Sequence, residues 1–222
     1  MRKLLVKIAA WAAVAAGLGL LALGLWRNRT EREPPRHPIQ REARPVVLVT
    51  VDTTRADRLG AYRADAGRGA GADSSLTPNL DRLAERGVLF EHAYSVAPIT
   101  LVAHTSILTG LEPPQHGVRN NGLHYVPDRL ETLAERLRDA GYATGAFVSA
   151  AVLDRRYNLT QGFDVYDDDL SAGRERHPRM VADRPAGAAV EAAAAWLDTL
   201  PPDRPFFLWL HLYDPHAPYS PP

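Results

Sequence analysis

Two residues, Asp52 and Thr100, have the types and flanking sequences expected of part of an ester-hydrolysis site that depends on a metal ion. Asp52 follows the β-branched apolar run at residues 46–51, which predicts a buried strand ending in a carboxylate. Open α/β sheets bind ligands at the carboxyl ends of their strands, and a carboxylate there suits a hard divalent cation. Thr100 begins a helix-like run that stops at Gly110, where free N–H groups and the helix dipole favour an alkoxide and a bound anion. A cation held by Asp52 would lower the pKa of that hydroxyl further.

Each of these residues also has an ordinary structural interpretation. Asp52 could cap the turn after its strand, and Thr100 could be the N-cap of the helix that it begins. The two roles of Thr100 are geometrically compatible, so the sequence does not separate a nucleophile from a cap. Asp57 is either a further oxygen ligand or a surface charge.

Other polar residues near these segments have weaker assignments. His104 lies one turn after Thr100 on the same predicted helix face, where it could contact a bound ester or the nucleophile, or simply pack. His211 and Asp214 have ordinary explanations as a strand-end histidine and a turn aspartate. Side chains that could contact an oxyanion, or face solvent as surface residues, are Arg55, Arg119 and Asn120.

The elements that would position these residues alternate between strand and helix. Apolar runs predict strands at residues 46–51, 88–94, 143–149 and 205–212. Helical spacing and stop signals predict helices at residues 76–87, 100–109, 130–140 and 185–200. In the first of these helices, Thr77 is the expected N-cap, Pro78 the first residue and Gly87 the C-cap. Residues 164–184 are polar and irregular. The pattern predicts an α/β fold, a three-layer sandwich with a largely parallel central sheet flanked by helices.

The composition excludes several classes of function. The 222 residues contain 26 Lys and Arg against 26 Asp and Glu, so the net charge of zero does not favour a nucleic-acid surface. The chain contains no cysteine, which excludes disulfides, thiolate metal sites and cysteine nucleophiles.

The amino-terminal segment predicts a membrane anchor. Residues 8–26 are apolar, with Arg2, Lys3 and Lys7 before them and Arg27 and Arg29 after them, and this length can cross a bilayer as a helix. A signal peptide cleaved near Ala22 or Gly24 and a buried core helix are the alternatives. The expected organisation is an anchor or signal at residues 1–27, a hydrated Pro-rich and charged linker at residues 28–44, and an α/β domain at residues 45–222.

From residue 44 onward the chain resembles the amino-terminal part of the sulfatase family, within the alkaline phosphatase superfamily. The strand ending in Asp52 and the order and spacing of several further motifs carry the resemblance. These motifs are TPNLDRLAERG at 77–87, SILTG at 106–110, GYAT at 141–144, QGFD at 161–164 and HLYDPHAPY at 211–219.

The resemblance implies roles for individual residues. Thr100 stands at the nucleophile position, where many sulfatases convert a cysteine to formylglycine and phosphoryl-transferring relatives use threonine. His104 takes the place of the family's arginine, and His216 matches a histidine that contacts the substrate's anionic group. Asp52 matches a ligand of a divalent cation, with calcium, zinc, manganese and magnesium all open.

Some positions depart from the family pattern. Thr53 replaces a second metal-binding carboxylate, and Ser149 and Ala151 replace a sulfate-binding lysine and histidine. Family members continue beyond the position of Pro222 and supply further metal ligands, so we expect this chain to correspond to an amino-terminal portion that is inactive alone.

The leading functional hypothesis is a membrane-anchored hydrolase of sulfate or phosphate esters that acts outside the cytoplasm. The expected partners are the ester substrate and, through the amino-terminal helix, the lipid bilayer. The alternatives are a transferase that moves a phosphoryl-linked group onto a cell-envelope component, and a catalytically silent envelope-binding domain.

Overall fold

The computed structural model describes residues 43–62, 76–171, 183–217 and 219. All of them belong to one compact unit that spans residues 39–222. The predicted anchor at residues 8–26 and nearly all of the predicted linker lie outside the described residues. Within the described ranges, no helix is both long enough and apolar enough to span a membrane.

The centre of the fold is a parallel β-sheet, as predicted. The strand order is β1-β4-β2-β3, and each neighbouring pair is parallel. The strands are β1 (Val46–Val51), β2 (Ala143–Phe147), β3 (Val165–Asp167) and β4 (Phe206–Leu212). Because all strands run the same way, the residues that follow them meet at one edge of the sheet.

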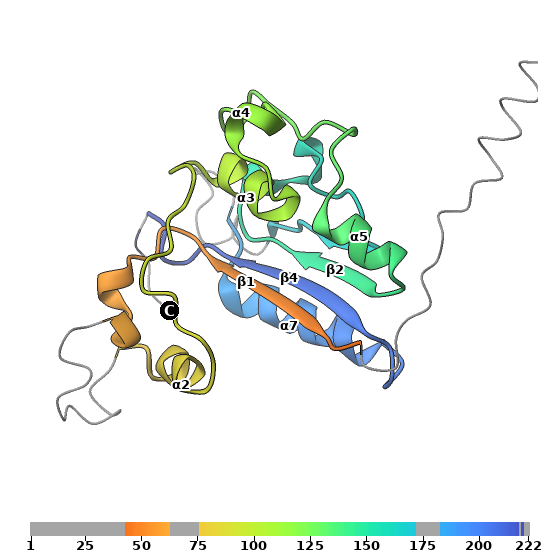
Figure 1. Ribbon diagram of the computed structural model, residues 1–222. Helices are drawn as coiled ribbons and strands as arrows, with labels where there is room; N and C mark the ends of the chain where they lie inside the picture. Colours follow the sequence, from red (N-terminus) through yellow and green to blue (C-terminus); the bar gives the residue numbers. More distant parts are fainter. Residues whose placement is uncertain (1–42, 63–75, 172–182, 218, 220–222) are drawn as a thin grey trace, which may run out of the picture. The chain divides into compact units, whose positions relative to one another are not determined.

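Helices cover both faces of the sheet (Figure 1), which confirms the predicted α/β architecture. Helices α3 (Thr100–Thr109) and α5 (Leu133–Asp139) lie on one face, and α7 (Ala186–Asp198) lies on the other, against β2 and β4. The remaining helical segments are α2 (Pro78–Arg86), α4 (Pro113–His116) and the 3-10 turns η1 (Ala56–Arg58), η2 (Gly60–Tyr62), η4 (Ala151–Leu153) and η5 (Arg155–Tyr157).

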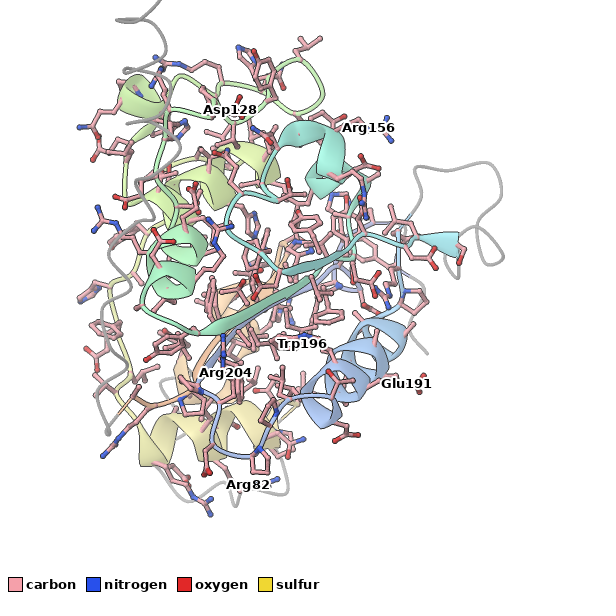
Figure 2. The ribbon with its side chains drawn as sticks, turned by 90° about the vertical axis from the view of Figure 1, so that its right-hand side faces the viewer. Arg82, Asp128, Arg156, Glu191, Trp196 and Arg204 are labelled. Atoms are coloured by element: carbon pink, nitrogen blue, oxygen red, sulfur yellow. The ribbon has the colours of Figure 1, made fainter. Side chains whose placement is uncertain are left out.

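Strand β4 divides the core because its successive side chains point to opposite faces. Phe207 and Trp209 join the cluster under α3, whereas Leu208 joins the smaller cluster under α7. Figure 2 shows Trp196 of α7 directed toward the sheet, and its ring packs on Phe147 with centroids 5.9 Å apart.

The prediction that residues 46–51 form a buried strand is half wrong. The strand exists, but Val47, Val49 and Val51 are 54%, 50% and 37% exposed. Strand β1 is at the sheet edge, and α7 packs on β2 and β4. Only the face toward α3 is therefore covered by described residues, and it receives Val46 and Leu48.

The strand predicted at residues 88–94 is wrong. These residues form turns and extended loop with no strand partner among the described residues, and Val88 and Phe90 are 79% and 70% exposed. Alternation of apolar residues does not by itself supply a neighbouring strand for the backbone hydrogen bonds. The carbonyl of Phe90 instead accepts a hydrogen bond from the Tyr62 hydroxyl.

Two other boundaries also differ from the prediction. Helix α5 begins at Leu133 rather than Leu130, because Thr132 and Glu135 form a capping box that fixes its start. A short strand, β3, lies inside the segment predicted to be irregular, and it pairs with Gly145–Phe147 of β2.

Candidate functional site

Asp52 lies at the carboxyl edge of the sheet, as predicted. Its backbone N–H donates to the carbonyl of Leu212 at 2.9 Å, so the pairing of β1 with β4 continues one residue past β1. Thr53 then adopts a positive φ of 53° and turns the chain away. The Asp52 carboxylate is therefore held beside the end of β4.

Thr100 is the first residue of α3 and faces Asp52. The N-cap position is Ile99, so the structure does not give Thr100 the capping role. The Thr100 hydroxyl donates instead to Asp52 Oδ2 at 3.0 Å. Two residues that are 48 positions apart in sequence are thus brought together as a hydroxyl and a carboxylate.

Asn121 caps α3 from outside the helix, and sequence analysis missed it. Its Oδ1 accepts a hydrogen bond from the backbone N–H of Leu101 at 2.9 Å. That N–H is one of the groups in the first turn that a helix leaves without an internal partner. An asparagine in a turn is an ordinary feature, and the sequence gives no sign that this one reaches a helix start 20 positions away.

His104 lies behind Thr100 and is only 6% exposed. Its Nδ1 lies 2.7 Å from the Thr100 carbonyl oxygen, and its Nε2 lies 3.1 Å from Thr50 Oγ1. Burial and the nearby His211 lower the pKa of His104 to about 4, so the ring is neutral at pH 7. Because both ring nitrogens have protein partners, His104 touches the predicted nucleophile through its backbone and has no nitrogen free for an ester.

His211, which the sequence placed only as a strand-end residue, is a neighbour of Asp52. The side chain is fully buried, and its Nε2 lies 3.4 Å from Asp52 Oδ2. Its ring meets His104 edge to face, with centroids 4.9 Å apart. The alternation of β4 contained the signal, since His211 must share the inner face with Phe207 and Trp209.

The environment keeps Asp52 ionised at neutral pH. Burial alone would raise the pKa of Asp52, but the contacts that His211 and Thr100 make with its carboxylate lower it, and the net shift is downward. The Thr100 hydroxyl therefore donates to a carboxylate rather than to a carboxylic acid.

His216 lies in the loop after β4 and connects to this cluster through Tyr213. Its ring stacks on Tyr213 with centroids 4.3 Å apart, and Tyr213 lies 6.1 Å from the ring of His211. Burial and the charges of Asp52 and Asp183 raise the pKa of Tyr213 to about 12. His216 Nδ1 lies 2.7 Å from the Ala217 carbonyl oxygen and donates to it, so Nε2 is the ring nitrogen left for another partner.

The side chains of Arg55, Arg119 and Asn120, for which the sequence left open an oxyanion contact or a surface role, lie on the surface. The Arg55 guanidinium makes paired hydrogen bonds to Asp57, at 2.9 and 2.7 Å, which also accounts for Asp57. Arg119 is exposed and influences the pKa of His116. Neither arginine contacts Asp52 or Thr100 within the described part of the chain.

The donor set around Asp52 is too small for a complete metal site. The described residues contain no group of three or more His, Cys, Asp or Glu side chains that could hold a metal ion. Asp52 supplies one carboxylate and Thr100 one hydroxyl, whereas a hard cation such as calcium takes about six to eight oxygen ligands. Any cation at Asp52 would need ligands beyond these residues.

Comparison with known proteins gives a consistent result. The family model described as Sulfatase matches residues 44–222. An arylsulfatase of Clostridium perfringens is 28% identical over 80% of this chain and 44% of its own length. The N-acetylgalactosamine-6-sulfatase of Rattus norvegicus is 31% identical over 69% of this chain and 28% of its own length. The chain therefore spans less than half the length of these relatives.

Solved structures share the fold. The phosphonate monoester hydrolase of Agrobacterium radiobacter superposes with a TM-score of 0.61 at 23% identity, covering 81% of this chain and 42% of that one. A protein of the alkaline phosphatase superfamily from Vibrio parahaemolyticus gives a TM-score of 0.56 at 19% identity, covering 85% of this chain and 44% of that one.

Proposed function

This chain belongs to the sulfatase family, and we propose that in the complete protein it hydrolyses sulfate or phosphate esters with Thr100 as the nucleophile. The hydrogen bond from Thr100 Oγ1 to Asp52 Oδ2 at 3.0 Å is the observation that carries this proposal. The family's relatives named arylsulfatase and N-acetylgalactosamine-6-sulfatase support a sulfate ester as the substrate.

The proposed reaction has two displacement steps. Thr100 Oγ attacks sulfur or phosphorus while its proton moves toward Asp52, and the bond from the central atom to the ester oxygen breaks. The leaving alkoxide takes a proton from water, and Asp52 returns its proton to solvent. A second water molecule then hydrolyses the threonine ester, which restores the hydroxyl and releases the sulfate or phosphate group. The first-turn N–H groups of α3 favour the negative charge that develops beside Thr100.

His216 is proposed to steady the anionic oxygens of the substrate. The ring is held in place by Tyr213 and by the Ala217 carbonyl, so its remaining nitrogen, Nε2, has a fixed direction.

A divalent cation is part of this proposal, since members of the sulfatase family are generally metal-dependent. Asp52 is the proposed ligand among the described residues, with calcium, zinc, manganese and magnesium as candidates. The described donors alone do not complete a site for any of these ions. We also propose that the domain is anchored in a membrane through residues 8–26 and lies outside the cytoplasm.

The test replaces Thr100 in the complete protein. Thr100→Ala should abolish turnover of aryl sulfates or phosphodiesters, and Thr100→Ser should keep part of it because a hydroxyl remains. The matched control is Thr109→Ala, at the other end of α3, where the hydroxyl donates to the carbonyl of Thr105 at 2.6 Å. Turnover by a folded Thr100→Ala protein at the wild-type rate would contradict the covalent mechanism.

A further inference from the structure

A chain of hydrogen bonds lies directly behind Asp52 and Thr100. The indole N–H of Trp209, on β4, donates to Thr50 Oγ1 at 3.1 Å. Thr50 Oγ1 also lies 3.1 Å from His104 Nε2, and His104 Nδ1 lies 2.7 Å from the carbonyl oxygen of Thr100. The chain therefore joins β4, β1 and α3.

Only one direction of donation satisfies every group in this chain. A carbonyl oxygen only accepts, so His104 Nδ1 carries the proton that it donates to Thr100. The indole N–H only donates, so Thr50 Oγ1 accepts from Trp209 and gives its own proton to His104 Nε2. Trp209 is fully buried and His104 nearly so, and a missing partner there would be costly.

We propose that Thr50, Trp209 and His104 are positioning residues that hold the Thr100 hydroxyl within hydrogen-bonding distance of Asp52. The proposal rests on the proposed function, in which Thr100 is the nucleophile. Thr50 stands two positions before Asp52 on the same strand end, and His104 stands one turn after Thr100 on α3. The chain thus ties the two elements together immediately behind the reacting pair.

This chain of hydrogen bonds fixes the position of α3 relative to β1 more narrowly than apolar packing alone does. The cluster under α3 would tolerate small sliding of the helix over the sheet, whereas a directed hydrogen bond fixes the Thr100 carbonyl relative to β1. A displacement of about 1 Å in a reacting group can cost on the order of 100-fold in rate. The alternative is a structural role alone, in which these hydrogen bonds only satisfy buried polar groups, as most buried polar groups are satisfied.

Thr50→Val separates these alternatives because it removes the hydroxyl while keeping the size of the side chain. In the complete protein we expect kcat to fall about tenfold or more with KM little changed, because substrate still binds but the nucleophile is misplaced. Thr50→Ser should restore most of kcat, since it returns the hydroxyl. Thr50→Ala carries the same test if the valine variant does not fold.

Thr105→Val is the matched control. Thr105 is fully buried on the same helix, and its hydroxyl donates to the Leu101 carbonyl at 2.7 Å without joining the chain. It should lose stability as Thr50→Val does but keep kcat. The same kcat in Thr50→Val as in Thr105→Val, whether unchanged or reduced, would overturn the proposal.

A second readout does not require turnover. Because the protein sequence contains no cysteine, Thr100→Cys introduces a single thiol, at the proposed site. With divalent cations removed by EDTA, the carboxylate of Asp52 disfavours the thiolate, so alkylation by iodoacetamide should be slow. Adding Thr50→Val should speed alkylation about threefold or more as residue 100 moves away from Asp52, and adding Thr105→Val should not.

The two readouts distinguish failure of this proposal from failure of the proposed function. A wild-type protein without sulfatase or phosphodiesterase activity would contradict the function, and the alkylation rates would still decide whether the chain positions residue 100. Equal alkylation rates with and without the Thr50 hydroxyl would overturn the positioning role even in an active enzyme.

Discussion

The two halves of the sheet's carboxyl edge use their carboxylates differently. At the ends of β1 and β4, Asp52 has a hydroxyl and an imidazole as neighbours, from Thr100 and His211. At the end of β3, which pairs with β2, each of two carboxylates meets an arginine. Asp168 receives hydrogen bonds from Arg155, and Asp167 lies 3.0 Å from the guanidinium of Arg184.

This difference supports the proposed site at the ends of β1 and β4. We call these two strand ends the functional half of the edge and the ends of β2 and β3 the structural half. A carboxylate paired with arginine already has its charge compensated and holds the fold together. Asp52 is ionised, as its lowered pKa shows, and no arginine or lysine contacts it among the described residues. Its charge is therefore available to a proton, a cation or a substrate, although all four strands end at the same edge.

Ser149 reinforces the contrast. It follows β2, is fully buried, and its Oγ has no hydrogen-bond partner within the described ranges. The family resemblance implies that Ser149 replaces a sulfate-binding lysine. The backbone carbonyl of Ser149 instead accepts from the N–H of Arg184 at 2.9 Å, so the serine is built into the structural half.

The largest expected effect comes from exchanging a carboxylate in each half. In the complete protein, Asp52→Asn should lower turnover about 100-fold or more and weaken divalent-metal binding, because the charge is lost while the size is kept. The matched change Asp168→Asn should leave both unchanged. Calorimetric metal titration and steady-state kinetics on the two variants measure this. Equal metal affinity in wild type and Asp52→Asn would remove Asp52 from the ligand set.

The second prediction concerns acid stability in the functional half. Burial holds the pKa of His104 at about 4, against 6.5 for an unperturbed histidine, so between these pH values the unfolded chain binds a proton that the folded chain does not. Stability should therefore fall as the pH drops from 6.5 to 4, by up to about 3 kcal/mol from this residue. Asp52 and His211 face His104 and act on the same titration.

Urea unfolding at several pH values tests this prediction. His104→Gln should flatten the stability profile between pH 6.5 and 4, because glutamine does not titrate. Asp52 acts in the same direction at lower pH, since its lowered pKa gives stability that is lost as the pH falls through the folded value. A profile for His104→Gln as steep as that of the wild type would contradict the assignment.

Sequence patterns predicted the parallel α/β layout and the meeting of Asp52 with Thr100, because strand periodicity, helix stop signals and the strand-end rule are local or topological. They could not predict that Asn121 caps α3, since nothing local in a turn asparagine points to a distant helix. The exposed valines of β1 were also missed, because a run of valines reads the same on a covered strand and at an edge. The inward direction of His211 was available from the alternation of β4 once the strand was placed.

The third prediction belongs to the structural half. Arg184→Met removes a buried guanidinium that pairs with Asp167 and donates to the Ala188 carbonyl at 3.0 Å. We expect a loss of about 2 kcal/mol in the free energy of unfolding, since Asp167 is left unpaired but partly exposed. Turnover per folded molecule should not change. A loss of turnover without a loss of stability would show that Arg184 contributes to the reaction rather than only to the fold.

The smallest expected effect is that of Arg55→Ala. Its side chain is 71% exposed and its guanidinium is bound to Asp57, whose side chain is 57% exposed, so the pair is solvated and screened by salt. The melting temperature should stay the same within error.

The kinetic result is more informative, because the sequence also allowed Arg55 to contact a substrate oxyanion. If Arg55 is only a surface charge, KM and kcat will match wild type in both Arg55→Ala and the control Arg156→Ala, an exposed arginine paired with Asp154. A rise in KM confined to Arg55→Ala would mean that substrate draws Arg55 away from Asp57, and would extend the functional half of the edge beyond Asp52 along the loop that follows β1.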